Sequence, residues 1–412
     1  MAARSAMHRA GASVIEQLLN AGAQSETETA CGCGRQARFH QMRPKQILTA
    51  LGQIRIERAY YICPHCHQGQ SPRDRELDVE GTEYSPAVRR MMALVGSEGS
   101  FQQGRQQLAD LAGLEVTTKA VERQAEAVGQ DIADREQAHI ERAVQLEIPQ
   151  VRADRIPVLY VEMDGTGIPV VKAETEGRQG KTEGQPAHTR EVKLGCVFTQ
   201  TGTDEQGWPV RDDASTTYTG AIETAEQFGR RIYREAWDRG CDRAKTKVVL
   251  GDGALWIWNI ADEYFPGAIQ IVDLYHARQH LWELAAKVYP ADEKQRKTWA
   301  SRLEKKLDAG RVEIVIKNLR AVSTPSVPLA ALIENEAVFF ERNAARMRYA
   351  QFRAQKLFVG SGVVEAGCKT VIGRRLKMSG MFWTVRGANS IIALRCNRIS
   401  GKFADYWDSR AA

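Results

Sequence analysis

The stretch LYVEMDGTG at residues 159–167 decides the fold class of this 412-residue chain. Apolar residues and a single glutamate precede Asp164, and two glycines follow it. The runs VVLGD at 248–252 and IQIVD at 269–273 also end in aspartate. Short apolar runs that end in glycine or aspartate are typical of buried strands in an α/β domain. We therefore predict such a domain from about residue 156, with further strands at 167–171 and 192–199.

Acidic residues follow these predicted strands, and α/β folds place their sites at the carboxyl edge of the sheet. Glycine follows both Asp164 and Asp252, so a sharp turn can leave each side chain accessible. Glu365 lies in the first turn of a helix predicted after FVGSG at 358–362, with Ser361 as its N-cap. One such aspartate alone would be interpreted as a helix cap. Three acids beside glycine instead predict an oxygen-only site for two Mg²⁺ or Mn²⁺ ions that act on a phosphodiester.

Two histidines follow the third aspartate. His276 and His280 are four residues apart, which is the spacing of paired zinc ligands on a helix. A third ligand and a glutamate between the histidines are missing, so we do not predict a metalloprotease. We expect His276 to support the carboxylates by positioning a phosphate, a leaving group or Asp273.

Two close cysteine pairs bracket a predicted hairpin with strands at 46–49 and 53–62. We predict that they hold a structural Zn²⁺, because so small a β unit has little core of its own. His65 and His67 lie close enough in sequence to substitute, and the alternative is four buried free thiols. The remaining four cysteines are scattered and are interpreted as buried apolar residues. The predicted zinc ligands are Cys31, Cys33, Cys63 and Cys66.

A helix-turn-helix is predicted after this unit. Residues 101–111 form its first helix, Gly113 lies in the turn, and Thr117 or Thr118 begins the second helix. The second helix would present Thr118, Lys119 and Arg123 to a DNA groove. The alternative is a plain helical bundle.

The segment 369–402 contains eight basic residues and no acidic one. Such a run is usually a solvated face, but aromatic residues interrupt this one, which favours a nucleic-acid track. Phe382 or Trp383 would stack on an unpaired base. The predicted phosphate contacts are Arg374, Arg375, Lys377 and Arg386.

Composition limits the class of protein. Hydrophobic residues make up 43% and charged residues 26%, which excludes extensive disorder. The net charge of +6 is compatible with a polyanionic partner. We expect no membrane span and no secretory signal, because no apolar run is long enough. The cysteine pattern favours a reducing compartment such as the cytoplasm.

Four motifs together resemble bacterial insertion-sequence transposases of the DDE type, specifically the ISKra group, which is related to the Mutator-like superfamily. They are MDGTG at 163–167, LGDGALW at 250–256, DLYH at 273–276 and GSGVVE at 360–365. The resemblance implies an RNase H-like catalytic domain with an all-α insertion before the glutamate. It also implies a bacterial cytoplasmic, nucleoid-associated protein. It also implies that Asp164, Asp252 and Glu365 are the catalytic triad and that Asp273 and His276 form an accessory signature.

We therefore expect a DNA transposase that cleaves transposon ends and transfers the 3′-hydroxyl into target DNA. Its partners would be double-stranded DNA, with terminal inverted repeats and a target, and further copies of the chain in a homodimer or larger oligomer. The alternatives are an RNase H-like nuclease and a domesticated, non-catalytic DNA-binding regulator. The predicted divisions are an N-terminal helix and linker at 1–30, a zinc-ribbon-like unit at 31–80, a helix-turn-helix region at 84–150, the catalytic domain at 151–273 and 356–412, and the insertion at 274–355.

Overall fold

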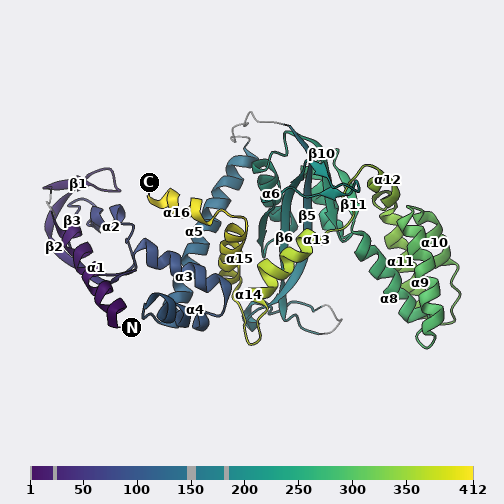
Figure 1. Cartoon of the computed structure of the whole chain (residues 1–412), viewed down its shortest axis with the longest axis horizontal. Helices are drawn as coiled ribbons and strands as arrows, with labels where there is room; N and C mark the ends of the chain where they lie inside the picture. Colours follow the sequence, from purple (N-terminus) through teal and green to yellow (C-terminus); the bar gives the residue numbers. More distant parts are fainter. Residues whose placement is uncertain (1, 22–25, 146–154, 181–184, 412) are drawn as a thin grey trace. The chain divides into compact units, whose positions relative to one another are not determined.

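The computed structural model describes residues 2–21, 26–145, 155–180 and 185–411 (Figure 1). The chain forms two compact units, the first from Met1–Ile132 with Lys402–Ala412 and the second from Ala133–Gly401. Helix α5 (Thr118–Val144) belongs to both. The predicted boundary between residues 150 and 151, and part of the predicted linker before residue 30, lie outside the described residues. None of the described helices is long and apolar enough to cross a membrane.

The first unit contains an antiparallel sheet of β1 (Glu28–Ala30), β2 (Gln36–Thr49), β3 (Gly52–Ile62) and β4 (Gly69–Gln70). Helix α1 (Ala2–Asn20) packs Ala12 and Ile15 against Ile54 and Ile56. The Asn20 side chain accepts a hydrogen bond from the N–H of Glu57 at 2.8 Å and donates one to the Arg55 carbonyl at 2.9 Å. The end of α1 therefore satisfies backbone groups of β3 as a neighbouring strand would.

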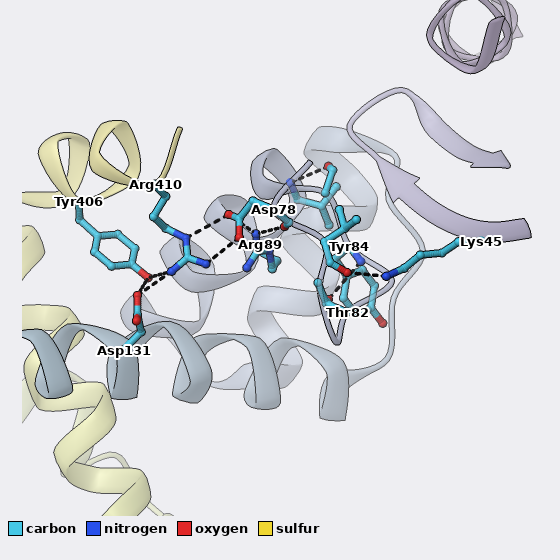
Figure 2. Close-up of polar contacts among 11 residues, drawn as sticks. Lys45, Asp78, Thr82, Tyr84, Arg89, Asp131, Tyr406 and Arg410 are labelled. Atoms are coloured by element: carbon cyan, nitrogen blue, oxygen red, sulfur yellow. Dashed lines mark hydrogen bonds and ion pairs between the residues drawn. The ribbon is translucent and has the colours of Figure 1, made fainter. Parts of the chain in front are cut away.

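A second core of the first unit is formed by Val88, Met92, Leu108, Leu114 and Val121, which come from α3 (Pro86–Glu98), a π-helical turn (Leu108–Ala112), the segment after it and the first part of α5. The unit also contains α2 (Pro72–Glu76), α4 (Phe101–Gln107) and α16 (Phe403–Ala411). Charged contacts fix α16 within this unit, as Figure 2 shows. Arg410 donates to Asp78 at 2.8 Å and to Asp131 at 2.6 Å, and Arg89 also pairs with Asp78.

A mixed five-stranded sheet forms the core of the second unit, which confirms the predicted α/β class. Its order is β11-β10-β5-β6-β9. Strands β5, β10 and β11 are parallel, and β6 is antiparallel to both of its neighbours. The strands are β5 (Ile156–Pro169), β6 (Thr189–Gln200), β9 (Thr217–Ala221), β10 (Ala244–Gly251) and β11 (Ile269–Val272), beside a small hairpin of β7 (Gly202–Thr203) and β8 (Pro209–Val210). The separate strand predicted at 167–171 is wrong, because β5 continues through Asp164 as one paired strand to Pro169.

Helices cover both faces of this sheet. On one face lie α6 (Ala225–Asp238) and α7 (Leu255–Tyr264), and a Cβ atom on Gly195 of β6 would lie 2.6 Å from the Ile232 side chain of α6. On the other face α13 (Gly362–Gly367) approaches so closely that a Cβ atom on Gly367 would lie 2.5 Å from the Tyr218 ring of β9. The chain continues through a π-helical turn (Cys368–Gly373) and α14 (Arg374–Leu376).

Helix α15 (Val385–Ile399) closes the edge of the sheet at β9. The Asn389 side chain accepts from the N–H of Ile222 at 2.8 Å, and the Ser400 hydroxyl accepts from the N–H of Tyr218 at 2.8 Å. An edge strand whose backbone groups are occupied in this way is protected from pairing with another chain.

A block of helices separates β11 from α13, and Figure 1 shows it gathered beside β11. It contains α8 (Leu274–Val288), α9 (Glu293–Asp308), α10 (Val312–Arg320), α11 (Val327–Arg342) and α12 (Tyr349–Ala354). We call these residues, 274–354, the helical block. Its buried side chains include Trp299, Leu303, Leu307, Val315 and Phe340.

Candidate active site and metal centre

Asp164, Asp252 and Asp273 lie level with one another across the sheet, although only the last two follow the ends of their strands. Leu250 of β10 pairs in register with Glu162 of β5, so two residues further Asp252 lies level with Asp164. Gly251 of β10 pairs with Val272 of β11, so Asp273 lies level with Asp252. Because the three strands are parallel, these carboxylates share one edge of the sheet.

Asp164 is half-buried. Its carboxylate accepts from the N–H of Gly165 at 2.7 Å and interacts with the thiol of Cys368. Burial raises the pKa of Asp164, hydrogen bonds from Cys368 and Gly165 oppose the rise, and the negative charge of Asp252 adds to it. The charge of Asp252 therefore opposes ionisation of Asp164.

The turn after β10 holds Asp252 in place. The Asp252 carboxylate accepts from the N–H of Ala254 at 2.9 Å. Gly253 has a φ of +102°, which side chains rarely adopt, and a Cβ atom there would lie 2.6 Å from the Phe339 ring of α11. Glycine therefore allows both the turn and the approach of the helical block.

Glu365 lies near this pair but does not join it at ligand distance. Its helix α13 packs against β5 and β6, and its charge acts on Cys368, the residue that contacts Asp164. The Glu365 side chain is exposed. Among the described residues, the four paired cysteines are the only group of three or more acidic, histidine or cysteine side chains whose ligand atoms all lie within 4.8 Å of one another.

Two buried carboxylates attach the start of α13 to the sheet. Asp273 is fully buried and accepts from the N–H of His276 at 2.6 Å, the hydroxyl of Ser361 at 2.8 Å and the N–H of Ser361. Glu162 is also fully buried and accepts from the N–H of Val364 at 2.8 Å. Burial raises the pKa of Glu162 to about 8, while the hydrogen bond from Val364 opposes the rise. The sequence analysis did not assign a role to Glu162, although a lone glutamate inside an apolar strand was the available signal.

The two histidines of α8 contact each other, as their spacing predicts. The Nε2 atoms of His276 and His280 are 3.2 Å apart, and His276 also interacts electrostatically with Asp164. His280 makes a further contact with Glu336 of α11, which the sequence analysis did not anticipate.

The basic C-terminal segment divides into exposed and buried residues. Arg374, Lys377 and Arg386 are exposed, and the Lys377 ammonium donates to the Thr166 hydroxyl of β5 at 2.5 Å. Arg375 is fully buried, with its guanidinium carbon 4.9 Å from the centre of the Trp383 ring.

Trp383 is 6% exposed and donates from its indole to the Leu376 carbonyl at 3.1 Å. Its own carbonyl accepts from the N–H of Val171 at 2.9 Å. The prediction that Arg375 and Trp383 contact DNA is therefore withdrawn, because both are used in packing. Phe382 is the exposed aromatic side chain of this stretch, at 67%.

Helices lie on both sides of the predicted turn in the first unit. Gly113 ends the first with a φ of +69°, and the Thr117 hydroxyl caps α5 by accepting from the N–H of Ala120 at 3.1 Å. Lys119 and Arg123 are exposed at the start of α5, and Thr118 is half-buried.

The paired cysteines converge between the turns of the β sheet in the first unit. The sulfurs of Cys31 and Cys66 are 3.5 Å apart, and those of Cys33 and Cys63 are 3.7 Å apart. Four sulfurs at about 2.3 Å from a tetrahedral Zn²⁺ would lie about 3.8 Å from one another. Backbone N–H groups of Cys66 and His65 lower the pKa of Cys63 to about 6, because they stabilise its thiolate. The group fits a zinc ion, whereas His65 and His67 are exposed and lie outside the cluster.

A family model described as an uncharacterised protein family, UPF0236, matches residues 5–406. The chain belongs to UPF0236. No curated protein matches this UPF0236 chain. Among solved structures, the chain is similar to the Drosophila P element transposase strand transfer complex, with 8% identity and a TM-score of 0.26. That match covers 81% of this chain and 83% of the other.

Proposed function

We propose that this UPF0236 chain is a DNA transposase of the DDE type, with Asp164, Asp252 and Glu365 as its catalytic acids. The observation that carries the proposal is the register of β5 and β10, which brings Asp164 and Asp252 together at the carboxyl edge of the sheet. Glu365 is supplied by α13, whose start is attached to the same edge through Glu162 and Asp273.

The topology supports an RNase H-like interpretation of the second unit. Strands β5, β6 and β9 are neighbours in the sheet and antiparallel, and β10 and β11 extend it in parallel on the other side of β5. The helical block follows the second aspartate and precedes the glutamate. This is the arrangement that the resemblance to the ISKra group and the Mutator-like superfamily implies.

The acidic residues fit Mg²⁺ or Mn²⁺, which prefer carboxylate oxygens. Burial and the charge of Asp252 both raise the pKa of Asp164, so a divalent cation between them would stabilise the ionised pair. Cations held by Asp164, Asp252 and Glu365 would lower the pKa of a bound water and neutralise phosphate charge. The chain itself supplies Lys377, whose contact with Thr166 places an ammonium group two residues from Asp164 to hold a phosphate.

We propose two successive reactions at this site. Water first cleaves a phosphodiester at a transposon end and frees a 3′-hydroxyl. That hydroxyl then attacks a phosphorus atom of the target DNA, forms a new P–O bond and displaces the target's own 3′-oxygen. No covalent bond between protein and DNA forms.

DNA contacts are proposed for the exposed basic residues. Arg374, Lys377 and Arg386 would hold phosphates near the acids, and Thr118, Lys119 and Arg123 of α5 would read terminal inverted repeats. Joining two ends to a target requires two such sites, so we propose that the active form is a homodimer or larger oligomer.

The proposal is tested with DNA that carries both ends of the genomic element surrounding the gene, in Mg²⁺ or Mn²⁺. Asp164→Asn, Asp252→Asn and Glu365→Gln should each lower cleavage by at least about 10³-fold, since each removes a charge that stabilises the transition state. Binding of the ends in a gel-shift assay should remain. Asp213→Asn, which changes an exposed acid of the second unit, is the matched control and should cleave normally.

Three results would contradict this function. Undiminished cleavage by Asp164→Asn or Glu365→Gln excludes the acid assignment. Cleavage without joining of pre-cleaved ends identifies an RNase H-like nuclease instead. Binding without cleavage by the unaltered chain identifies a non-catalytic regulator.

A further inference from the structure

A series of hydrogen bonds connects the helical block with the edge of the sheet that carries Asp164, Asp252 and Asp273. Nδ1 of His280 and a carboxylate oxygen of Glu336 are 2.7 Å apart, and the Nε2 atoms of His280 and His276 are 3.2 Å apart. Both distances lie within hydrogen-bonding range. These contacts therefore run from α11 to the His276 ring of α8, whose backbone N–H is held by Asp273 in the same row as Asp252.

Packing holds the hydrogen-bonded residues Glu336, His280 and His276 in place. The His280 ring stacks on Phe339 of α11 with 4.2 Å between ring centres and an interplanar angle of 11°. Phe339 in turn lies against Gly253, the residue after Asp252. The backbone N–H of His276 is held by the buried Asp273. Helix α11 therefore contacts both the turn beside Asp252 and the histidine pair.

The chemistry of the Glu336 carboxylate and of neutral imidazole decides which atom donates and which accepts in each contact. An ionised carboxylate can only accept, so the Glu336 contact requires a proton on Nδ1 of His280. A neutral imidazole carries one proton, so Nε2 of His280 is then an acceptor. With both rings neutral, the second contact is donated by Nε2 of His276. This leaves Nδ1 of His276 with an unshared electron pair.

We propose that Glu336 and His280 are positioning residues that set His276 in its Nε2–H tautomer, so that Nδ1 accepts a hydrogen bond from the attacking hydroxyl. This inference rests on the proposed function, because it names the hydroxyl nucleophile as the group that His276 holds. It differs from the expectation that His276 binds a phosphate, which would require a donor. It also assigns the helical block a role in the site.

The tautomers are measured first, without DNA. The chain has eight histidines, so selective ¹⁵N-histidine labelling with two-bond ¹H–¹⁵N correlation spectra, assigned with His276→Gln and His280→Gln, resolves the two rings. The unaltered chain should carry its protons on Nε2 of His276 and Nδ1 of His280. Glu336→Ala should move the His280 proton to Nε2, and the His276 proton to Nδ1.

The rate of strand transfer is the second readout. Glu336→Ala should lower kcat about 10-fold and leave KM for DNA unchanged, because partners that orient a functional histidine typically contribute 10–100-fold. The matched control is Glu334→Ala on the same helix, whose carboxylate pairs with Arg320 instead. This control should keep both the tautomers and the rate.

Three outcomes overturn the proposal: a proton on Nδ1 of His276 in the unaltered chain, unchanged tautomers in Glu336→Ala, or an equal loss of kcat in Glu334→Ala. If the tautomers and their response to Glu336→Ala are as expected but the unaltered chain does not cleave DNA, the positioning by Glu336 stands and the proposed transposase function fails.

Discussion

The four-cysteine cluster and the group of candidate acids, Asp164, Asp252 and Glu365, differ in how far apart in sequence their members lie. The cysteines come from two short turns 30 residues apart, and their sulfurs already lie at the spacing that a tetrahedral ion requires. The acids come from two strands and a helix, with Asp164 and Glu365 about 200 residues apart in sequence. The first group depends on one small sheet, whereas the second depends on the whole second unit. The candidate acids therefore depend on residues that attach α13 to the sheet. Glu162 and Asp273 make these attachments.

Removing the metal should have the largest effect. Structural zinc contributes about 10–16 kcal/mol to the folding of small zinc-binding peptides. We expect Cys63→Ser to lose bound zinc, measured by elemental analysis, and to expose residues 31–70 to proteolysis while the second unit resists. Cys241→Ala, which alters a buried cysteine outside the cluster, should keep the zinc. A Cys63→Ser variant that retained both zinc and protease resistance would show that the cluster is merely four packed thiols.

Removing a support of the acid site should have the next largest effect. Asp273→Ala leaves the backbone N–H groups of His276 and Ser361 without their acceptor. We expect a loss of about 2–4 kcal/mol of unfolding free energy, since an unsatisfied buried group costs about 1–3 kcal/mol and the N–H of His276 is only partly buried. Hydrogen exchange should rise in residues 361–367, which are α13 and its N-cap.

The matched control for this variant is Ser361→Ala. It removes one hydroxyl donor and leaves both backbone contacts, so we expect a loss of about 1 kcal/mol. Equal losses in the two variants would mean that Asp273 is not a support, and that α13 is held by apolar packing alone.

The candidate acids could be predicted from sequence because the signal is local. An apolar run followed by aspartate indicates a buried strand, and parallel strands bring such aspartates level with one another. Asp252 follows the end of β10 as expected, whereas β5 continues past Asp164 to Pro169. The cysteine pairs are equally local. The contact between His280 and Glu336 spans 56 residues and depends on how α11 packs, so spacing could not reveal it.

In the basic segment 369–402, prediction from sequence did not separate exposed from buried arginines. Arginine is usually exposed, so Arg375 and Arg395 were counted with the surface charges. In the fold Arg375 stacks on Trp383, and Arg395 donates to the Val371 carbonyl at 2.7 Å. Charge density in a sequence therefore cannot distinguish residues that contact a polyanion from those that satisfy carbonyl groups inside a helical turn.

The smallest expected effect concerns Asp78, a partly buried carboxylate that binds Arg410 of α16. Asp78 in the first unit accepts from Arg410 and Arg89, and its side chain is 27% exposed, unlike Asp273. Partial burial opposes ionisation, but the hydrogen bond from Arg410 and the charge of Arg89 outweigh it and hold the pKa of Asp78 below its usual range. The stabilisation is therefore present at neutral pH and is lost as the pH falls through the lowered pKa of the folded state.

We expect Asp78→Asn to cost about 1–2 kcal/mol at neutral pH and progressively less in acid, because the protonated carboxyl no longer attracts the arginines. The position has a φ of +48°, which asparagine tolerates as well as aspartate, so the variant changes charge without straining the backbone. Hydrogen exchange of residues 403–411 across pH 3–7 measures the effect, and Asp405→Asn on the exposed side of α16 is the control. A loss that does not depend on pH would mean that Asp78 acts through its hydrogen-bonding geometry rather than its charge. Asp78 and the fully buried Asp273 would then differ only in how far each is buried.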